Sequence, residues 1–439
     1  MEATSYDVLL VNAPSAYRLP ASSRKDHVGI GYLTSVLRAN GISVRVLDTP
    51  MLEWGVEQAL KDILPVTARV IGISALQAQA DGLVGLAKGI RASGCRAPIV
   101  LGGQFPTFCY DRLLVDFPEV DAVVRGEGEV PFLAMVQRIL AGDDWRDVPG
   151  VAYLSGGQAV ANPTPDLITD LDALPFPARD TLPAVRSIGA MVSVSSSRGC
   201  PCRCVFCSIP NFYRLSKGPI WRMRSPESVL EEIKSLIADH DVHRFIFVDD
   251  NFIGVGERGK QRARDIAELM IRENLKVEFL LSCRVTDVDE ELFGLLKRAG
   301  LVSVGLGVES GNQRQLDTYN KGTTVEDNKR AIRTLRKLGV DPGMGFIMAD
   351  PYFTAEELLA NLQFLKEVGV SLSDLTFPLG ELWVFDGTDI LPKLKAEGRL
   401  RGNYLKGYSY VPAHKGFYSL YRAASWVRDH LRPAPKRPV

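Results

Sequence analysis

The sequence predicts an α/β protein in which a doubly wound sheet is followed by a partial barrel of six β/α units. Three observations lead to this prediction. Short apolar runs alternate with helical stretches, which is the pattern of parallel strands joined by crossover helices. A proline-rich stretch interrupts the alternation between residues 151 and 190. The alternation then resumes, and most of the later apolar runs end in polar residues.

The first unit, residues 1–150, is expected to form the doubly wound sheet. Its apolar runs are short and bounded by polar or turn residues, as in buried parallel strands. A glycine, Gly41, closes the first helix as a left-handed cap. Ligands bind such sheets outside the carboxyl ends of the strands, where Asn12, Ser74 and Gly102–Gly103 would lie. The expected elements are strands at Val8–Asn12, Val44–Asp48, Val70–Ser74 and Ile99–Gly103, and a helix at Gly29–Gly41.

Residues 151–190 are expected to link the two units. Prolines at 163, 165, 175 and 177 cannot continue a helix or a central strand. The partial barrel is expected over residues 191–390, with a short extension and a disordered tail over 391–439. Its expected strands are Phe245–Val248, Val277–Leu281, Val302–Val308 and Pro342–Met348, after a first strand that begins at Val192; its expected helix caps are Ser225, Thr324 and Thr354.

Composition excludes several classes of function. Lys+Arg and Asp+Glu both number 52, so nothing indicates nucleic acid or an anionic membrane as a partner. The start lacks a signal peptide and no apolar run is long enough to cross a bilayer, so a cytoplasmic protein is expected. The seven cysteines are an odd number and four lie together, which favours a reduced compartment and an inorganic centre over disulfides. We expect Cys95, Cys109 and Cys283 to be small buried hydrophobes.

Three cysteines, Cys200, Cys204 and Cys207, stand in C-x-x-x-C-x-x-C spacing within one short loop. Their thiolates can converge on a single inorganic centre. A 4Fe–4S cluster normally has four thiolate ligands, so three would leave one iron open to an amine and a carboxylate. Zinc usually recruits a second paired element, and the chain offers none. Cys202 can substitute as a ligand but is interpreted as a free thiol.

This spacing resembles the signature of the radical S-adenosylmethionine (SAM) superfamily. The resemblance implies a 4Fe–4S cluster, SAM bound at the open iron, an external electron donor and release of a 5′-deoxyadenosyl radical. In the first unit, Leu101–Thr107 and Val124–Glu129 resemble the cobalamin-binding domain found in front of many such enzymes. The resemblance extends from Tyr6 to Gly398.

Cobalamin itself is left open. The first strand is not followed by D-x-H-x-x-G, so the usual lower axial histidine is missing. His27 is expected to be a solvated loop residue. Members of this branch bind cobalamin without that histidine, so the alternatives are a cobalamin domain and a Rossmann-like domain kept as a substrate lid or dimer surface.

The resemblance also assigns residues at the strand ends to SAM. Asp249 and Asp250 would lie near its amine, Ser282 and Arg284 near its carboxylate, and Glu309 with Ser310 near its ribose. Phe206 would lie beside adenine. An acidic group suits the ammonium, and a guanidinium suits the carboxylate. The alternatives are a turn at Asp249–Asn251 and a surface ion pair at Arg284.

The expected reaction is dehydration of a polar small molecule. The short C-terminal extension and the missing histidine favour radical-only chemistry, resembling diol-dehydratase-type enzymes of aminoglycoside assembly, with an amino sugar as substrate and a separate reductase. A base would assist, with Asp350 and Tyr352 as weak candidates. The alternatives are cobalamin-dependent C-methylation in natural-product biosynthesis and a non-catalytic sensor of iron or redox state.

Overall fold

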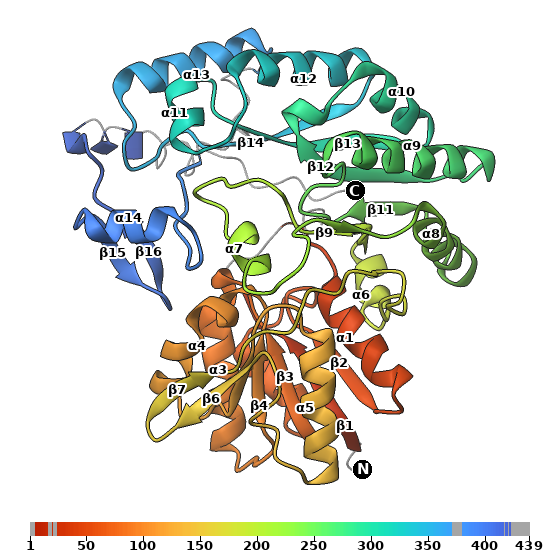
Figure 1. The fold of residues 1–439 in the computed structure, drawn as a ribbon, viewed down its shortest axis with the longest axis vertical. Helices are drawn as coiled ribbons and strands as arrows, with labels where there is room; N and C mark the ends of the chain where they lie inside the picture. Colours follow the sequence, from red (N-terminus) through yellow and green to blue (C-terminus); the bar gives the residue numbers. More distant parts are fainter. Residues whose placement is uncertain are drawn as a thin grey trace.

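The computed structural model describes residues 5–15, 20, 24–370, 380–416, 418, 419, 421 and 422. An N-terminal domain and a barrel domain, each built on a mainly parallel sheet, lie one above the other (Figure 1). The α/β fold expected from the alternation is confirmed. None of the helices in the described ranges has the length and apolar character needed to span a membrane.

The N-terminal sheet has seven strands in the order β2-β1-β3-β4-β5-β6-β7. The first five in sequence run parallel, and the last two form an antiparallel hairpin at the edge. The hairpin extends the sheet into the stretch expected to be a linker. The strands are β1 Ser5–Asn12, β2 Val44–Asp48, β3 Thr67–Ser74, β4 Ile99–Gly102, β5 Ala122–Val124, β6 Val151–Ser155 and β7 Gln158–Ala161.

Alternate side chains of the N-terminal sheet enter two separate cores. Val8 and Leu10 of β1 pack on one face, with helices α1 (Val28–Ala39) and α5 (Glu129–Ala141). Leu9 and Val11 pack on the other face, with α2 (Val56–Ile63), α3 (Ala80–Ala92) and α4 (Gln104–Asp116). This two-sided covering explains why the strands are continuous apolar runs rather than alternating ones.

The barrel domain contains five parallel strands in the part of the chain that is described, in the order β8-β11-β12-β13-β14. Helices cover its outer face, whereas Glu278 and Ser282 of β12 are exposed on the inner face. A sixth unit of the expected barrel would follow α13, where residues 371–379 lie outside the described ranges. The strands are β8 Val192–Val194, β11 Arg244–Phe247, β12 Glu278–Arg284, β13 Leu301–Glu309 and β14 Asp341–Phe346; the helices are α8 Pro226–His240, α9 Gly256–Arg272, α10 Glu290–Arg298, α12 Val325–Lys337 and α13 Ala355–Glu367.

The expected helix ends are confirmed. Ser225 accepts a hydrogen bond from the N–H of Ser228 at the start of α8. Thr324 and Thr354 form capping boxes at the starts of α12 and α13. Gly41 has a φ of +74°, as its position after α1 requires.

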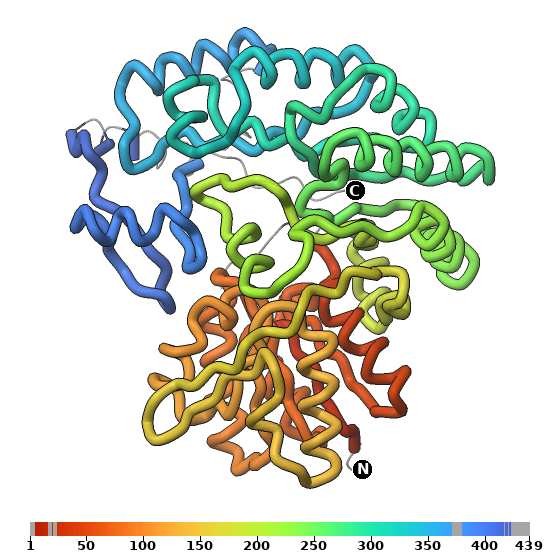
Figure 2. The backbone as a smooth tube through the Cα atoms, viewed as in Figure 1, coloured from red at the N-terminus to blue at the C-terminus, as the bar shows by residue number. Residues whose placement is uncertain are grey.

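Small elements join the two domains. The strands β9 (Ser197–Arg198) and β10 (Arg222–Met223) pair antiparallel at the two ends of the segment that contains the cysteines and helix α7 (Ile209–Tyr213). That segment runs between the domains (Figure 2). Two further short helices are α6 (Leu182–Ser187), which precedes β8, and α11 (Gln313–Thr318), which follows β13.

The C-terminal extension binds the N-terminal domain from the side (Figure 1). It consists of α14 (Ile390–Ala396) and a hairpin of β15 (Leu400–Asn403) and β16 (Gly407–Tyr410). The ring of Tyr404 stacks on Phe105 with centroids 6.3 Å apart, and its hydroxyl donates to Asp116. The extension also contacts Pro351 and Tyr352 of the barrel domain, so it binds both domains. The expected disordered tail, Arg432–Pro438, lies outside the described residues.

Candidate functional site

The loop of residues 199–208, here called the cluster loop, is held from several sides. It starts at Gly199, whose φ is +89° and where a side chain would collide with the carbonyl oxygen of Ile220. The N–H of Val205 donates to the carbonyl of Tyr319 at 3.0 Å, and the N–H of Ile390 donates to the carbonyl of Val205 at 3.0 Å. The loop path is therefore fixed by residues far away in the sequence.

The four thiols of the cluster loop share one neighbourhood with two cations. Arg284 donates to the sulfur of Cys202, which also hydrogen-bonds to Cys200. The bond from Cys200, helped by Arg284, lowers the pKa of Cys202 to about 6, and the same bond raises the pKa of Cys200. Burial raises the pKa of Cys207 to about 11, while Lys321 opposes this shift.

Within the described residues, no three side chains of the metal-binding types converge closely enough to hold a metal ion. Ligation of one centre by Cys200, Cys204 and Cys207 therefore requires their side chains to move closer together. The donor set nevertheless fits an iron–sulfur cluster, because soft thiolates are its ligands and nearby cations balance its negative charge.

The two expected acidic residues have different surroundings. Asp249 is buried and accepts from the N–H groups of Ser196 and Ser197 at 2.8 and 2.6 Å. Its other oxygen accepts from the Ser196 hydroxyl at 2.6 Å. Asp249 thus anchors the chain just before the cluster loop, whereas Asp250 accepts from the N–H of Gly199 at 3.0 Å and lines a cavity. Burial raises the pKa of Asp250 to about 6.

Ser282, Arg284 and Glu309 all lie at the end of the barrel sheet that carries the cluster loop. Ser282 is exposed on the inner face of β12. Arg284 donates to the carbonyl of Lys321 at 2.6 Å, so it faces the cluster loop rather than forming a surface ion pair. Glu309 has a φ of +61° and pairs with the ammonium of Lys321 at 2.8 Å.

Phe206 packs edge-on against Tyr319, with ring centroids 5.7 Å apart. Ser310 is fully buried, and its hydroxyl lies 2.7 Å from Gln315 Oε1 and 2.9 Å from Asn361 Oδ1. This buried position gives no support to the expected contact between Ser310 and ribose.

The geometry also gives no support to the two candidate bases. Asp350 is buried and accepts from the Tyr319 hydroxyl at 2.7 Å, from Gln315 at 2.9 Å and from the N–H of Tyr352 at 2.6 Å. The Tyr352 hydroxyl contacts Glu397 of the C-terminal extension at 3.0 Å. Asp350 therefore already accepts three hydrogen bonds, and the Tyr352 hydroxyl is engaged by Glu397.

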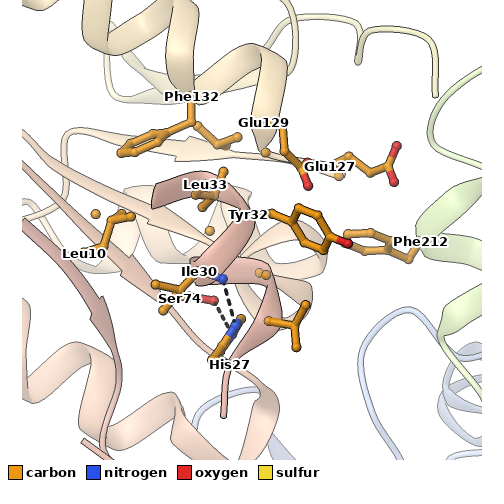
Figure 3. A pocket seen from close by; sticks show the side chains of 18 of the residues that line it. Leu10, His27, Ile30, Tyr32, Leu33, Ser74, Glu127, Glu129, Phe132 and Phe212 are labelled. Carbon is orange, nitrogen blue, oxygen red and sulfur yellow. Dashed lines mark hydrogen bonds between the residues drawn. The ribbon is translucent and has the colours of Figure 1, made fainter. Parts of the chain in front are cut away.

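A cavity of about 300 Å³ separates the carboxyl ends of the N-terminal strands from the barrel domain. Leu10, Leu33 and Phe132 line its apolar end, and Tyr32, Glu127 and Phe212 lie toward its other end (Figure 3). Gly72 also lines this apolar end, here called the apolar slot. A Cβ at Gly72 would come within 2.7 Å of Leu10 Cδ2 and 3.1 Å of Phe132 Cζ, so a side chain there would displace these two lining residues. Ser74, Gly103, Arg198, Tyr213 and Asp250 line the rest of the cavity.

His27 is not a solvated loop residue, contrary to the expectation. It caps α1, and its Nδ1 accepts from the N–H of Ile30 at 3.1 Å. Because Nδ1 accepts, the proton of the neutral ring is assigned to Nε2, which lies 3.2 Å from Ser74 Oγ (Figure 3). Burial lowers the pKa of His27. Both ring nitrogens thus have partners at the wall of the cavity.

Buried ion pairs cross the interface between the domains. Glu127 accepts from Arg198 at 2.9 Å and from Arg222 at 2.8 Å, and Glu129 accepts from Arg198 at 2.6 Å. Burial by itself would raise the pKa of Glu127, but the two arginines hold it below its usual value. Sequence reasoning included Glu127 and Glu129 in a family resemblance but missed their ion pairs, Lys321 and the role of His27, because each depends on a partner in another element.

The fold and the site define a two-domain α/β protein in which a cysteine loop at the mouth of a partial barrel faces a Rossmann-like domain across a cavity. Comparison with protein families matches residues 194–365 to the radical SAM superfamily and residues 21–136 to the B12 binding domain. The chain belongs to the radical SAM superfamily, in the branch with an N-terminal B12 binding domain.

Curated relatives cover most of the chain. An uncharacterized methyltransferase of Pyrococcus horikoshii is 30% identical over 387 residues, which are 86% of this chain and 82% of that protein. An anaerobic magnesium-protoporphyrin IX monomethyl ester cyclase of Rubrivivax gelatinosus is 33% identical over 406 residues, 86% of this chain and 71% of the cyclase.

Solved structures share the fold. The cobalamin-dependent SAM radical enzyme OxsB, with aqua-cobalamin and SAM bound, superposes with a TM-score of 0.79 at 22% identity, over 98% of this chain and 67% of that one. The radical SAM methyltransferase TsrM of Kitasatospora setae, with cobalamin and cluster bound, gives a TM-score of 0.71 at 20% identity, over 90% of this chain and 75% of that one.

These findings resolve what the sequence left open. The expected 4Fe–4S cluster and SAM are confirmed as the cofactors of the family, and the match to the B12 binding domain supports cobalamin, which the sequence left open. The expected lean toward dehydration is not supported. A methyltransferase and a cyclase are among the relatives, which favours the alternative of methyl transfer.

Proposed function

We propose that this protein is a cobalamin-dependent radical SAM methyltransferase that acts on a carbon atom of a small molecule. The observation that carries the proposal is the cavity at the carboxyl edge of the N-terminal sheet, which is also lined by Arg198 and Asp250 beside the cluster loop. A cofactor bound in this cavity would face a SAM bound at the cluster. The name of the P. horikoshii relative supports the choice of methyl transfer.

The cavity fits cobalamin in its chemistry. The apolar slot beside Gly72 suits the benzimidazole base at the end of the nucleotide tail, since Leu10, Leu33 and Phe132 surround it. Gly103 has a φ of +89°, and a Cβ there would come within 2.8 Å of Ser74 Oγ. A backbone without a side chain at this point lets a flat macrocycle approach the strand ends closely.

The barrel residues would hold SAM and keep water out. The guanidinium of Arg284 would bind the carboxylate of SAM. The carboxylate of Glu309, which also pairs with Lys321, would bind the amine or the ribose of SAM. Phe212 and Tyr213 of α7 cover the passage between the cavity and the barrel with aromatic surface. When bound, the cluster would supply the electron that cleaves SAM, and cobalamin would carry the methyl group.

Product analysis tests the proposal. Protein reconstituted anaerobically with iron, sulfide and cobalamin is incubated with reductant, SAM and an extract fraction or candidate substrate. Methyl transfer gives S-adenosylhomocysteine together with 5′-deoxyadenosine. 5′-Deoxyadenosine without S-adenosylhomocysteine contradicts methyl transfer, and failure of the loaded protein to cleave SAM supports the non-catalytic sensor instead.

A radical-only ring closure is the second candidate, because one relative is named a cyclase at 33% identity. It predicts 5′-deoxyadenosine alone in the same experiment. Dehydration of an amino sugar with a separate reductase belongs to this radical-only class and gives the same nucleoside product.

A further inference from the structure

One carboxylate connects the paired strands β9 and β10 to the N-terminal domain. Glu127 lies in the turn between β5 and α5, and its two oxygens separately accept from Arg198 and Arg222. Those arginines are direct cross-strand partners in the β9–β10 pair. Glu127 therefore binds both β9, which leads into the cluster loop, and β10, its partner strand.

The three side chains of this network are largely buried. The side chains of Glu127, Arg198 and Arg222 are only 10%, 12% and 2% exposed. The guanidinium of Arg198 is shared with Glu129 at 2.6 Å and lies over the ring of Tyr32 at 4.9 Å. A buried charge that loses one partner is left uncompensated, so such a network resists displacement.

The same residues touch both cofactor sites. Arg198 precedes the first cluster cysteine, Cys200, by two positions, and the intervening Gly199 donates to Asp250 in the cavity wall. Glu127, Glu129 and Arg198 all line the cavity (Figure 3 shows the two glutamates beside Tyr32). A displacement of Arg198 would therefore move the cluster loop and the cavity wall together.

We propose that Glu127 and Arg198 are positioning residues that set the distance and orientation between the cluster loop and the interdomain cavity. The inference rests on the proposed function in one respect, namely that the cavity holds cobalamin. Two cofactors on separate domains can exchange a group only if their loops are held in register, and an error of about 1 Å can cost about 100-fold in rate.

A second buried carboxylate at the domain interface provides a matched control. Asp26, in the N-terminal domain, accepts from Arg179 at 3.0 Å and from the N–H of Ser193 in β8 at 2.8 Å. Its side chain is 6% exposed, so it is buried to a similar degree as Glu127. It is attached to a barrel strand and not to the cluster loop. If these carboxylates only stabilise the domain interface, Asp26→Asn and Glu127→Gln should have the same effects on the cluster spectrum and on the products.

The test compares Glu127→Gln, Arg198→Lys and Asp26→Asn with the wild type, each reconstituted with iron, sulfide and cobalamin. Arg198→Lys keeps the charge but loses the fork that joins two carboxylates. The readouts are iron and sulfide content, thermal stability, the EPR spectrum of the reduced cluster with and without SAM, and 5′-deoxyadenosine released per methylated product.

We expect all four proteins to carry the cluster. In Glu127→Gln and Arg198→Lys the EPR change caused by SAM differs from that of the wild type, and 5′-deoxyadenosine per product rises about 10-fold or more. Asp26→Asn keeps the wild-type spectrum and ratio at a comparable loss of thermal stability.

The inference is overturned if Glu127→Gln and Arg198→Lys give the same spectra and ratio as Asp26→Asn. Should Glu127→Gln fail to fold, Arg198→Lys alone decides. If the wild type itself binds no cobalamin, the proposed function fails, while the comparison of cluster spectra still decides whether Glu127 positions the loop.

Discussion

Replacing Gly72 with valine should impair cobalamin binding without affecting the iron–sulfur cluster. Gly72 lies in β3 and lines the apolar slot, and a valine there would collide with Leu10 and Phe132 and displace them into the slot. A buried aromatic group of the size of the benzimidazole base covers about 150–250 Å². At about 25 cal/mol per Å², its burial stabilises the complex by about 4–6 kcal/mol.

Filling the slot should therefore weaken cobalamin binding by about 1,000-fold or more, since about 1.4 kcal/mol corresponds to a factor of ten. The assay is equilibrium dialysis of apoprotein against cobalamin, with the absorbance spectrum as readout. Iron and sulfide content should stay at the wild-type level because Gly72 belongs to the other domain. Overpacking alone is expected to cost about 1–3 kcal/mol of stability.

Gly85→Val is the matched control, because Gly85 lies against Val56 in the same domain but outside the cavity. It should lose stability without losing cobalamin. The reasoning is refuted if folded Gly72→Val protein binds cobalamin within about threefold of the wild type, or if Gly85→Val loses binding equally.

Three further predictions concern the barrel side of the site. Gly199→Ala puts a side chain at a φ of +89° against the Ile220 carbonyl, so the melting temperature and the iron content should both fall; unchanged iron would contradict the role of this turn. Arg284→Lys should raise the dissociation constant for SAM about 10-fold through loss of a charge-assisted hydrogen bond worth about 1.5 kcal/mol, whereas Arg244→Lys, exposed at the other end of the sheet, should not. The pKa of Asp250 is raised from 3.8 to about 6 by desolvation in the cavity wall, so the folded apoprotein holds a proton in this window that the unfolded chain has released. Its stability should therefore fall as the pH rises from about 4 to about 6, by clearly less than the ~3 kcal/mol of the full shift because solvent screens the exposed side chain, and Asp250→Asn should remove this slope. The free energy of unfolding would be measured by urea denaturation at several pH values. Equal dependence on pH for the wild type and the variant would show that the pKa of Asp250 is not raised by its surroundings.

The sequence predicted those elements whose signal is local. The strands β1, β3 and β4 contain apolar runs whose side chains are buried on both faces of the sheet, and the caps at Ser225, Thr324 and Thr354 depend on neighbours a few residues away. The strand β5 has three residues, too few to show a pattern. The β6–β7 hairpin was missed although Gly156 and Gly157, both with positive φ, gave a turn signal in a stretch dominated by proline.

The site was predictable only where spacing is diagnostic. Cys200, Cys204 and Cys207 share one loop, so their pattern is visible in the sequence. The pairing of Glu127 with Arg198 joins residues 71 positions apart in different domains, and no local pattern encodes it. His27 was misjudged for a related reason, because one partner of its ring, Ser74, lies 47 positions away in β3. Asp249 also illustrates this limit, since its sequence position gave no hint that backbone N–H groups saturate it.

The most direct test of the central claim is the position of the two metals in the loaded protein. Crystals of protein reconstituted with cluster and cobalamin would be measured at the iron and cobalt absorption edges, so that anomalous differences locate each element. The account predicts iron at Cys200, Cys204 and Cys207 and cobalt in the cavity beside Ser74 and Gly103. Iron bound by other residues, or cobalt absent from that cavity in protein that retains cobalamin, would contradict it.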